Sequence, residues 1–335
     1  MSWKGNEGKI FGRVGDKMYD VISFGSITVD VFLGTEASEM DGKLQYPAGT
    51  KIYVKDIDFH TGGCGMNIAI GLKRMGCRTA LLGKFGDDLN AIMIKDVLRK
   101  EGIPFLGPKG NGRTGYSVVL DSKKHNRTIL HYRGASNTFK PKELRKSKIK
   151  AKWLYMASAL GDTFRTQKVL AGIAARRGIK IAYNPGINEC RKGSKHLREI
   201  LRATEMAIMN KGEAAALSKQ AETEDMLTTI RRMGPKIVCI TNGNNDTQCY
   251  ENGVIFRLKP HDIRVKERTG AGDAFSAGVV AGMAKGKGIE HSLQLGLANS
   301  ESVIQYFGAT NKLLSWRNAN QMIIRKPGKV KKGIA

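Results

Sequence analysis

Short apolar segments alternate with amphipathic segments along most of this 335-residue chain. The segment YDVISFG (19–25) has the pattern of a buried strand that ends at a glycine. The segment MNIAIGLKRMG (66–76) instead places Ile68, Leu72 and Met75 at helical spacing, and its last glycine is a good helix stop. Because this change of period recurs, the sequence predicts a three-layer α/β/α fold with a mainly parallel central sheet.

The remaining elements follow the same alternation. We expect further strands at 78–86, 152–158, 179–186, 206–210 and 236–243. We expect helices at 88–102, 163–177, 194–202 and 211–220. The segment TQCYENGVIFRL (247–258) has the pattern of a β-hairpin.

Two segments interrupt the alternation. Residues 28–60 contain extended stretches separated by turns, and residues 114–133 have the pattern of a hairpin with a polar turn. We expect these two segments to form a small β-sheet lid over the main sheet. The sequence therefore predicts one α/β domain over residues 18–324, preceded by a flexible leader at 1–17 and followed by a basic tail at 325–335.

Composition narrows the class of protein. A hydrophobic content of 41% is enough for a large core. The apolar run AGVVAGMA (277–284) is far shorter than the roughly 20 residues that a membrane helix needs, and residues 1–17 lack the apolar centre of a secretory signal. The five cysteines are scattered and form no CxxC pair. This predicts a cytoplasmic protein without disulfides or a cysteine metal cluster.

The formal net charge of +26 raises the question of a nucleic-acid partner. Residues 140–152 carry seven basic residues and one acidic residue, and 325–332 carry five basic residues. The chain contains no RNP-type aromatic pair, Cys/His finger or basic recognition helix. A solvated basic surface outside the active site is therefore the favoured interpretation, and a nucleic-acid partner is the alternative.

Three predicted strands end in asparagine. Asn184, Asn210 and Asn242 follow strands that the alternation places in one parallel sheet. A single asparagine there is often only a turn residue. Ligands of open α/β sheets bind beyond the carboxyl ends of the strands, so three such residues favour a common site at that edge.

The segment RTGAGDAFSAG (268–278) removes side chains from a turn and then places a carboxylate at the start of a helix. Gly270, Ala271 and Gly272 leave backbone N–H groups open, and a helix that starts at Asp273 adds the positive end of its dipole. Phosphate oxygens fit such a turn, and the carboxylate can accept a proton from an attacking hydroxyl. The alternative is a structural turn in which Asp273 only caps the helix.

RTGAGDAFSAG resembles the C-terminal signature of the ribokinase-like (PfkB) family of sugar and nucleoside kinases. TGGCGMNIAIGLKRMG (61–76) resembles the family's N-terminal signature. Shorter matches are GSITVD (25–30), GKFGDD (83–88), YRGASN (132–137) and NKGE (210–213). The resemblance covers residues 19–310 and implies a kinase that uses ATP and Mg²⁺ to phosphorylate a sugar hydroxyl.

The resemblance also implies roles for individual residues. Asp273 would be the catalytic base, and Gly270, Ala271 and Gly272 would form the anion hole. The residues that hold substrate hydroxyls would be Asp30, Gly62, Gly63 and Asn67. The residues on the nucleotide side would be Asn184, Asn210, Glu213, Thr241, Gly243 and Asn299. Glu213 would also contact Mg²⁺ through water.

One part of the second signature departs from the family. Many members have Asp-Thr-Thr before the glycine turn, and that neighbourhood helps to bind a monovalent cation; this chain has Glu267-Arg268-Thr269. Glu267 and Thr269 occupy the positions of the family's cation site, with the carboxylate moved by one methylene group, and this departure leaves open whether a K⁺ ion activates the protein. The segment GDDLN (86–90) also departs from the family, which usually has glycine at the position of Asn90.

The expected partner is a small-molecule sugar. A nucleoside kinase of the same fold is the alternative within the family. A non-catalytic nucleic-acid-associated protein with this fold is the alternative outside it. The sequence does not fix the oligomeric state, and the open edges of a β lid would allow two copies to pair as a homodimer.

Overall fold

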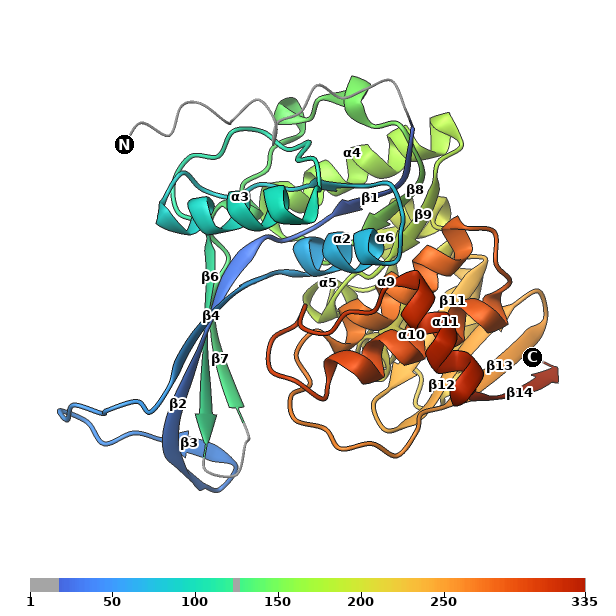
Figure 1. Ribbon diagram of the computed structural model, residues 1–335. Coiled ribbons are helices and arrows are strands. Elements are labelled where there is room, and N and C mark those ends of the chain that lie inside the picture. Colours follow the sequence, from blue (N-terminus) through green and yellow to red (C-terminus); the bar gives the residue numbers. More distant parts are fainter. Residues whose placement is uncertain (1–17, 123–126, 335) are drawn as a thin grey trace.

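The computed structural model describes residues 18–122 and 127–334. Within these residues the body contains one nine-stranded sheet, shown in Figure 1. Its strands, in order across the sheet, are β14 (Lys329–Ile334), β13 (Val254–Lys259), β12 (Asn245–Glu251), β11 (Ile237–Asn242), β10 (Met206–Asn210), β9 (Lys180–Tyr183), β8 (Ala151–Met156), β1 (Tyr19–Phe24) and β5 (Thr79–Leu82). Neighbours from β5 to β11 run parallel, and β12, β13 and β14 extend the sheet antiparallel.

Helices cover both faces of this sheet. One layer contains α2 (Cys64–Arg74), α3 (Leu89–Glu101), α9 (Ala271–Ala284), α10 (Ile289–Val303) and α11 (Trp316–Arg325). The other contains α4 (Gly161–Arg177), α5 (Ile187–Arg191), α6 (Ser194–Ala203), α7 (Lys211–Ser218) and α8 (Thr223–Arg232). Successive strand residues pack into opposite layers, as Val21 and Ile22 do. Burial on both faces explains why the parallel strands are continuous apolar runs.

A second, smaller sheet projects from one end of the body in Figure 1. It contains β2 (Thr28–Met40), β3 (Lys43–Gln45), β4 (Ile57–Gly62), β6 (Gly115–Ser122) and β7 (Arg127–Tyr132). Strand β2 pairs with β3, β4 and β6, and β6 pairs with β7. The two segments that break the strand–helix alternation therefore meet in one sheet, and the predicted α/β/α fold with a β-sheet lid is confirmed.

The C-terminal segment differs from the expected basic tail. Lys329–Ile334 pair residue by residue with Val254–Lys259, so β14 is an edge strand of the main sheet. Without β14, the outer N–H and C=O groups of β13 would have no hydrogen-bond partners. Pairing with β14 supplies those partners, which explains why this segment is a strand. Lysines are common on such edges, since their charge discourages pairing with another chain. The predicted leader at 1–17 lies outside the described residues.

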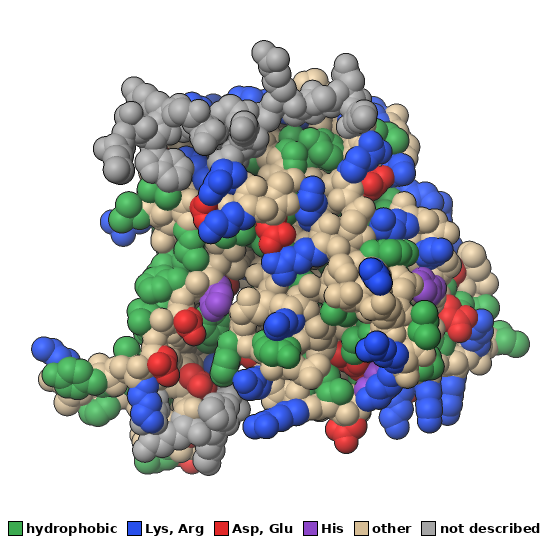
Figure 2. All heavy atoms as spheres, viewed as in Figure 1, with side chains coloured by type: hydrophobic (Ala, Val, Ile, Leu, Met, Phe, Trp, Pro, Cys, Tyr) green, Lys and Arg blue, Asp and Glu red, His purple; other side chains and the backbone are tan. Residues whose placement is uncertain are grey.

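The other basic segment, 140–152, lies at the amino ends of the strands. It leads into β8, and the Tyr19 N–H donates to the Lys150 carbonyl at 2.9 Å. Lysine and arginine side chains are also spread over much of the face in Figure 2. In the described ranges, no helix combines the length and apolar character that a membrane crossing requires.

Candidate active site

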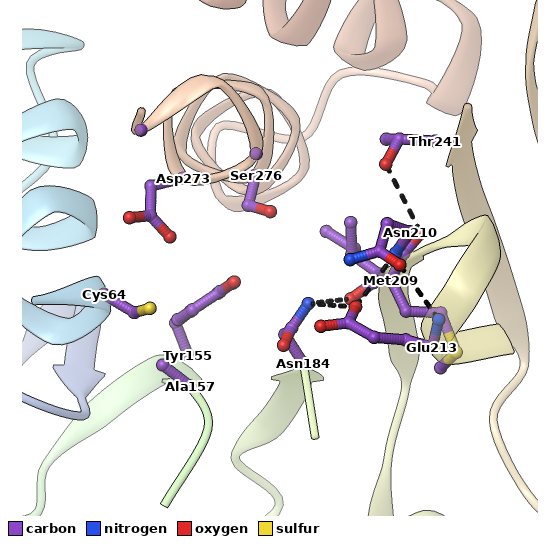
Figure 3. Close-up of a pocket in the computed structure, with 13 residues that line it drawn as sticks. Cys64, Tyr155, Ala157, Asn184, Met209, Asn210, Glu213, Thr241, Asp273 and Ser276 are labelled. Carbon is purple, nitrogen blue, oxygen red and sulfur yellow. Dashed lines mark hydrogen bonds between the residues drawn. The ribbon is translucent and has the colours of Figure 1, made fainter. Parts of the chain in front are cut away.

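A cavity of about 210 Å³ opens at the carboxyl ends of the parallel strands. Figure 3 shows side chains from both halves of the chain pointing into it. Its walls are Cys64, Tyr155, Ala157, Asn184, Ile208, Met209, Asn210, Glu213, Thr241, Gly270, Gly272, Asp273 and Ser276. Of the three strand-end asparagines, Asn184 and Asn210 line this cavity, and Asn242 is absent from its walls.

The turn before Asp273 is shaped by two glycines with different roles. Gly270 has φ 80° and is the residue that caps α9, which begins at Ala271 rather than at Asp273. A Cβ on Gly270 would also collide with Ala309. Gly272 has open space around its Cα, and it lines the cavity. Gly270, Gly272 and Asp273 therefore line the cavity from this helix start, while the Ala271 N–H donates to the Arg268 carbonyl at 3.3 Å.

Asp273 is held by two side chains from α2. Asn67 Nδ2 donates to Asp273 Oδ2 at 2.8 Å, and the Cys64 thiol also donates to this carboxylate. Burial raises the pKa of Asp273 to about 6; the two hydrogen bonds lower the pKa, and the charges of Glu213 and Asp30 raise it further. A helix start favours the ionised carboxylate and by itself would lower this pKa, so burial has the larger effect here.

The opposite wall is built around Glu213. Its Oε2 accepts from the Asn210 N–H at 2.9 Å and from Asn184 Nδ2 at 3.2 Å. The Asn210 side chain in turn accepts from the Glu213 N–H at 2.9 Å, which completes a capping box at the start of α7. Burial raises the pKa of Glu213, and the hydrogen bonds from Asn210 and Asn184 oppose this. These contacts fix a carboxylate at the end of β10.

The lid carries a row of polar side chains on one face. Strand register aligns Asp30 with His60 on β4 and with Ser117 on β6, and it aligns Ser117 with His131 on β7. Ser117 Oγ and His131 Nδ1 are 2.9 Å apart, so these neighbours share a face. His60 lies against Gly308 of the body, so this face is directed toward the body.

Two further predicted substrate residues lie beside Asp30. A Cβ on Gly62 would overlap the Asp30 carboxylate, so only glycine leaves room for that side chain. Gly63 has φ 90° and caps α2, where a Cβ would collide with the Ser26 carbonyl. Neither glycine is among the cavity walls, and both instead allow β4 to turn tightly into α2.

Comparison with known proteins agrees with this geometry. The family model for "pfkB family carbohydrate kinase" matches residues 18–316. The chain belongs to the PfkB family. An uncharacterized sugar kinase from Archaeoglobus fulgidus is 28% identical over 253 residues, which cover 73% of this chain and 98% of that protein. The chain is thus a phosphotransferase of a family that acts on alcohol groups.

Solved structures show the same fold. The nucleoside kinase of Methanocaldococcus jannaschii, an archaeal member of the ribokinase family, superposes with a TM-score of 0.75 at 21% identity, covering 93% of this chain and all of that one. A putative ribokinase II from E. coli in complex with ATP and Mg²⁺ gives a TM-score of 0.77 at 18% identity, covering 91% of this chain and 99% of that one.

Two predicted nucleotide residues of this PfkB-family chain lie away from the cavity walls. Asn299 is completely buried: its Nδ2 donates to the Ala274 carbonyl, and its Oδ1 accepts from the Leu314 N–H. These contacts give Asn299 a structural role and leave its amide without a free atom for a base. Gly243 forms the turn between β11 and β12 with φ 59° and has open space around it.

The structure also adds residues that sequence reasoning missed. Cys64 follows the glycine pair directly, so its position in the first signature was the available signal. Tyr155 and Ser276 point into the cavity from β8 and α9 (Figure 3). His60, Ser117 and His131 share the lid face of Asp30 through strand register, which the linear pattern does not reveal.

The expected monovalent-cation residues have other partners. Glu267 Oε1 accepts from the Thr269 N–H and from Thr269 Oγ1, both at 2.8 Å. The same oxygen forms an ion pair with Arg127 at the start of β7. In the described ranges, no group of three or more His, Cys, Asp or Glu side chains is arranged to hold a metal ion.

Proposed function

We propose that this protein transfers the γ-phosphoryl group of ATP to a hydroxyl group of an unphosphorylated sugar. The observation that carries the proposal is Asp273. It is a buried carboxylate at the open first turn of α9, held by Asn67 and Cys64. A carboxylate with a pKa of about 6 is mostly ionised at neutral pH, so it can accept a proton.

The chemistry follows from this position. Asp273 accepts the hydroxyl proton as the sugar oxygen forms its bond to the γ-phosphorus, and ADP leaves with the electrons of the broken P–O bond. In the proposed anion hole of Gly270, Ala271 and Gly272, the N–H groups of Gly270 and Gly272 hold the charge that develops on the phosphoryl oxygens, and Ala271 shapes the turn through its own hydrogen bond to Arg268. The raised pKa makes Asp273 a stronger base than an exposed aspartate.

The Glu213 wall is the proposed nucleotide side. Asn184, Asn210 and Thr241 surround this carboxylate at the ends of three neighbouring strands (Figure 3). Both hydrogen bonds to the carboxylate end on Oε2. Oε1 would therefore be the atom that meets water on a Mg²⁺ ion, which supplies neutralising charge on the phosphates when it is bound. Gly243 and Asn299 would contribute to nucleotide binding only by fixing the position of the backbone around them.

The lid face is the proposed sugar side. Asp30, Asp58 and Asp121 share this face by strand register, and carboxylates accept hydrogen bonds from sugar hydroxyls. Arg127 lies opposite Asp121 on the same face, so Asp30 and Asp58 are the carboxylates that would repel the dianion of a sugar phosphate at short distance. This arrangement favours a neutral sugar over a phosphorylated one.

A substrate panel tests the proposal. ADP release would be measured with ribose, fructose, other hexoses, hexose phosphates, ketodeoxy sugar acids and nucleosides. We expect a neutral sugar to give the highest kcat/KM. A nucleoside as the best substrate would support the alternative within the family. Salt-dependent retention on RNA or DNA without phosphorylation of any substrate would support the nucleic-acid alternative.

A further inference from the structure

The ion pair between Arg127 and Glu267 joins two regions that are far apart in the sequence. Arg127 begins lid strand β7, and Glu267 lies in the segment that leads to the glycine turn of α9. The Glu267 side chain is only 10% exposed and that of Arg127 is 29% exposed. A carboxylate this deeply buried needs a positive partner, and Arg127 is the partner that the structure supplies.

Glu267 is also connected to the anion hole. Its Oε1 accepts both Thr269 hydrogen bonds at 2.8 Å, and its own N–H donates to the Ile304 carbonyl at 3.1 Å. Gly270 follows Thr269 directly in the chain, and it packs against Ala309. The position of the glycine turn therefore depends on the position of the Glu267 carboxylate.

The pair lies beside a cavity of about 240 Å³ between the lid and the body. Phe32, Asp121 and Arg127 line it from the lid, and Lys266, Glu267 and Phe307 line it from the body. The Lys266 ammonium group lies over the Phe307 ring, 5.8 Å from its centre. Lys266 is thus a nearby positive charge with a different partner, which makes it a matched control for Arg127.

These contacts do not fit a monovalent cation bound by Glu267 and Thr269. The Glu267 carboxylate is already neutralised by a guanidinium group, and the Thr269 hydroxyl donates its hydrogen to that carboxylate. A monovalent cation at this carboxylate would meet the positive charge of the guanidinium at short distance, which opposes its binding. The longer side chain of glutamate, compared with the family's aspartate, lets the carboxylate reach both Thr269 and the lid.

We propose that the Arg127 guanidinium replaces the monovalent cation, so that this kinase positions its anion hole without K⁺. The proposal rests on the proposed function for its kinetic test. It makes Arg127 a positioning residue, which acts on the phosphoryl site through Glu267 and Thr269. It also makes lid contact with the body a condition for an ordered anion hole.

The test compares cations at constant ionic strength. Turnover of the best sugar would be measured in KCl, NaCl and tetramethylammonium chloride. Wild-type kcat is expected to differ less than about twofold among these salts. Arg127→Gln is expected to lose about 5- to 150-fold in tetramethylammonium, the usual range for coupling between two sites, and to recover in KCl. Arg127→Lys and Lys266→Gln should stay independent of the salt.

Thermal unfolding gives a second readout that needs no turnover. KCl should raise the Tm of Arg127→Gln relative to tetramethylammonium chloride and leave the wild-type Tm unchanged. The double variant Arg127→Gln with Glu267→Asp restores the family's acid without the guanidinium, and it should respond to K⁺ most strongly.

Two outcomes would overturn the proposal. One is a wild-type enzyme that K⁺ activates severalfold. The other is an Arg127→Gln variant that responds to K⁺ no more than wild type in either readout. If wild type phosphorylates no sugar or nucleoside in any salt, the proposed function fails separately, and the unfolding readout still decides whether Arg127 replaces the cation.

Discussion

Asn67 on α2 donates a 2.8 Å hydrogen bond to Asp273 on α9, and this contact joins two signatures that lie 206 residues apart in the chain. The oxygen atom of the same Asn67 amide differs from its nitrogen. Asn67 Oδ1 is buried and has no hydrogen-bond partner among the described residues. A buried acceptor without a partner is costly unless a ligand completes it. We therefore propose that Asn67 holds the base with its nitrogen and a substrate hydroxyl with its oxygen.

Asn67→Ala should therefore change both binding and base strength. We expect kcat/KM to fall about 10- to 100-fold, the loss that follows when a hydrogen bond to a charged group is removed. The lost donor should also raise the pKa of Asp273, because Asn67 now lowers it. A pH–rate profile would show the acidic limb at higher pH than in wild type. An unchanged limb would contradict the role of Asn67 at the carboxylate.

Asp30→Asn, on the lid, should change the pKa of Asp273 in the direction opposite to Asn67→Ala. The charge of Asp30 raises the pKa of Asp273, so its removal should move the acidic limb to lower pH. The sugar should bind about 10- to 100-fold more weakly, while the affinity for MgATP stays close to wild type. Calorimetry with each ligand alone would separate these effects. Normal sugar affinity in this variant would show that Asp30 is not a substrate residue.

Asp273→Asn tests the base itself. The amide keeps the size and some hydrogen bonds of the carboxylate but cannot accept the substrate proton. We expect the variant to fold, to bind MgATP and to lose on the order of 10²–10⁴ in kcat. Asp162→Asn is a suitable control, because Asp162 also lies in the first turn of a helix but pairs with Arg165 at the surface. Near-normal turnover by Asp273→Asn would reduce Asp273 to a structural residue.

The pKa of Asp273 also predicts two pH dependences of opposite sign. For activity, kcat/KM should rise with pH and level off above about 6, because the base must be ionised. For stability, a carboxyl group whose pKa is raised from 3.8 to about 6 on folding binds its proton more tightly in the folded state. Its contribution to the free energy of unfolding therefore falls as the pH rises from about 4 to 6.

Asp273→Asn should remove that second dependence. At pH 8 the variant should be more stable than wild type, by on the order of 2–3 kcal/mol, and at pH 4 the two should be similar. Urea unfolding at both pH values measures this difference. Equal stability of the two proteins at pH 8 would mean that the folded-state pKa of Asp273 is close to its ordinary value.

The fold was largely predictable because its signals are local. Strands such as β1 and β8 are apolar runs that are buried on both faces, and the helix pattern of α2 is visible within one segment. The start of α9 was misplaced by two residues, because a glycine at φ 80° begins the helix earlier than the acidic residue suggests. A helix boundary depends on backbone angles that cannot be predicted from the side chains alone.

The sequence predicted the site residues that belong to the family signatures. It did not predict properties and contacts that arise only from tertiary structure. The pKa of Asp273 follows from burial, which a helix-start argument omits. His131 joins Ser117 through register, and Arg127 reaches Glu267 across 140 positions. These pairings depend on how the lid folds over the body. A sequence pattern with a two-residue period identifies the lid strands but not their partners.

The C-terminal strand gives the last prediction. Deletion of residues 327–335 removes β14 and leaves the backbone groups of β13 as a new edge. It also removes the 2.7 Å ion pair from Lys332 to Glu290 and the contact of that ammonium group with the Phe256 ring. We expect a Tm several degrees below wild type and stronger self-association, since open edges pair with other chains. The kcat measured well below the Tm should stay near wild type, because β11, which carries Thr241, lies three strands from β14.

Lys332→Ala is the control for this deletion. It removes the side-chain contacts but keeps the strand, so its Tm should fall much less. An unchanged Tm after deletion would show that β14 contributes nothing to the sheet. A folded deletion variant without activity would place the C-terminal strand in catalysis.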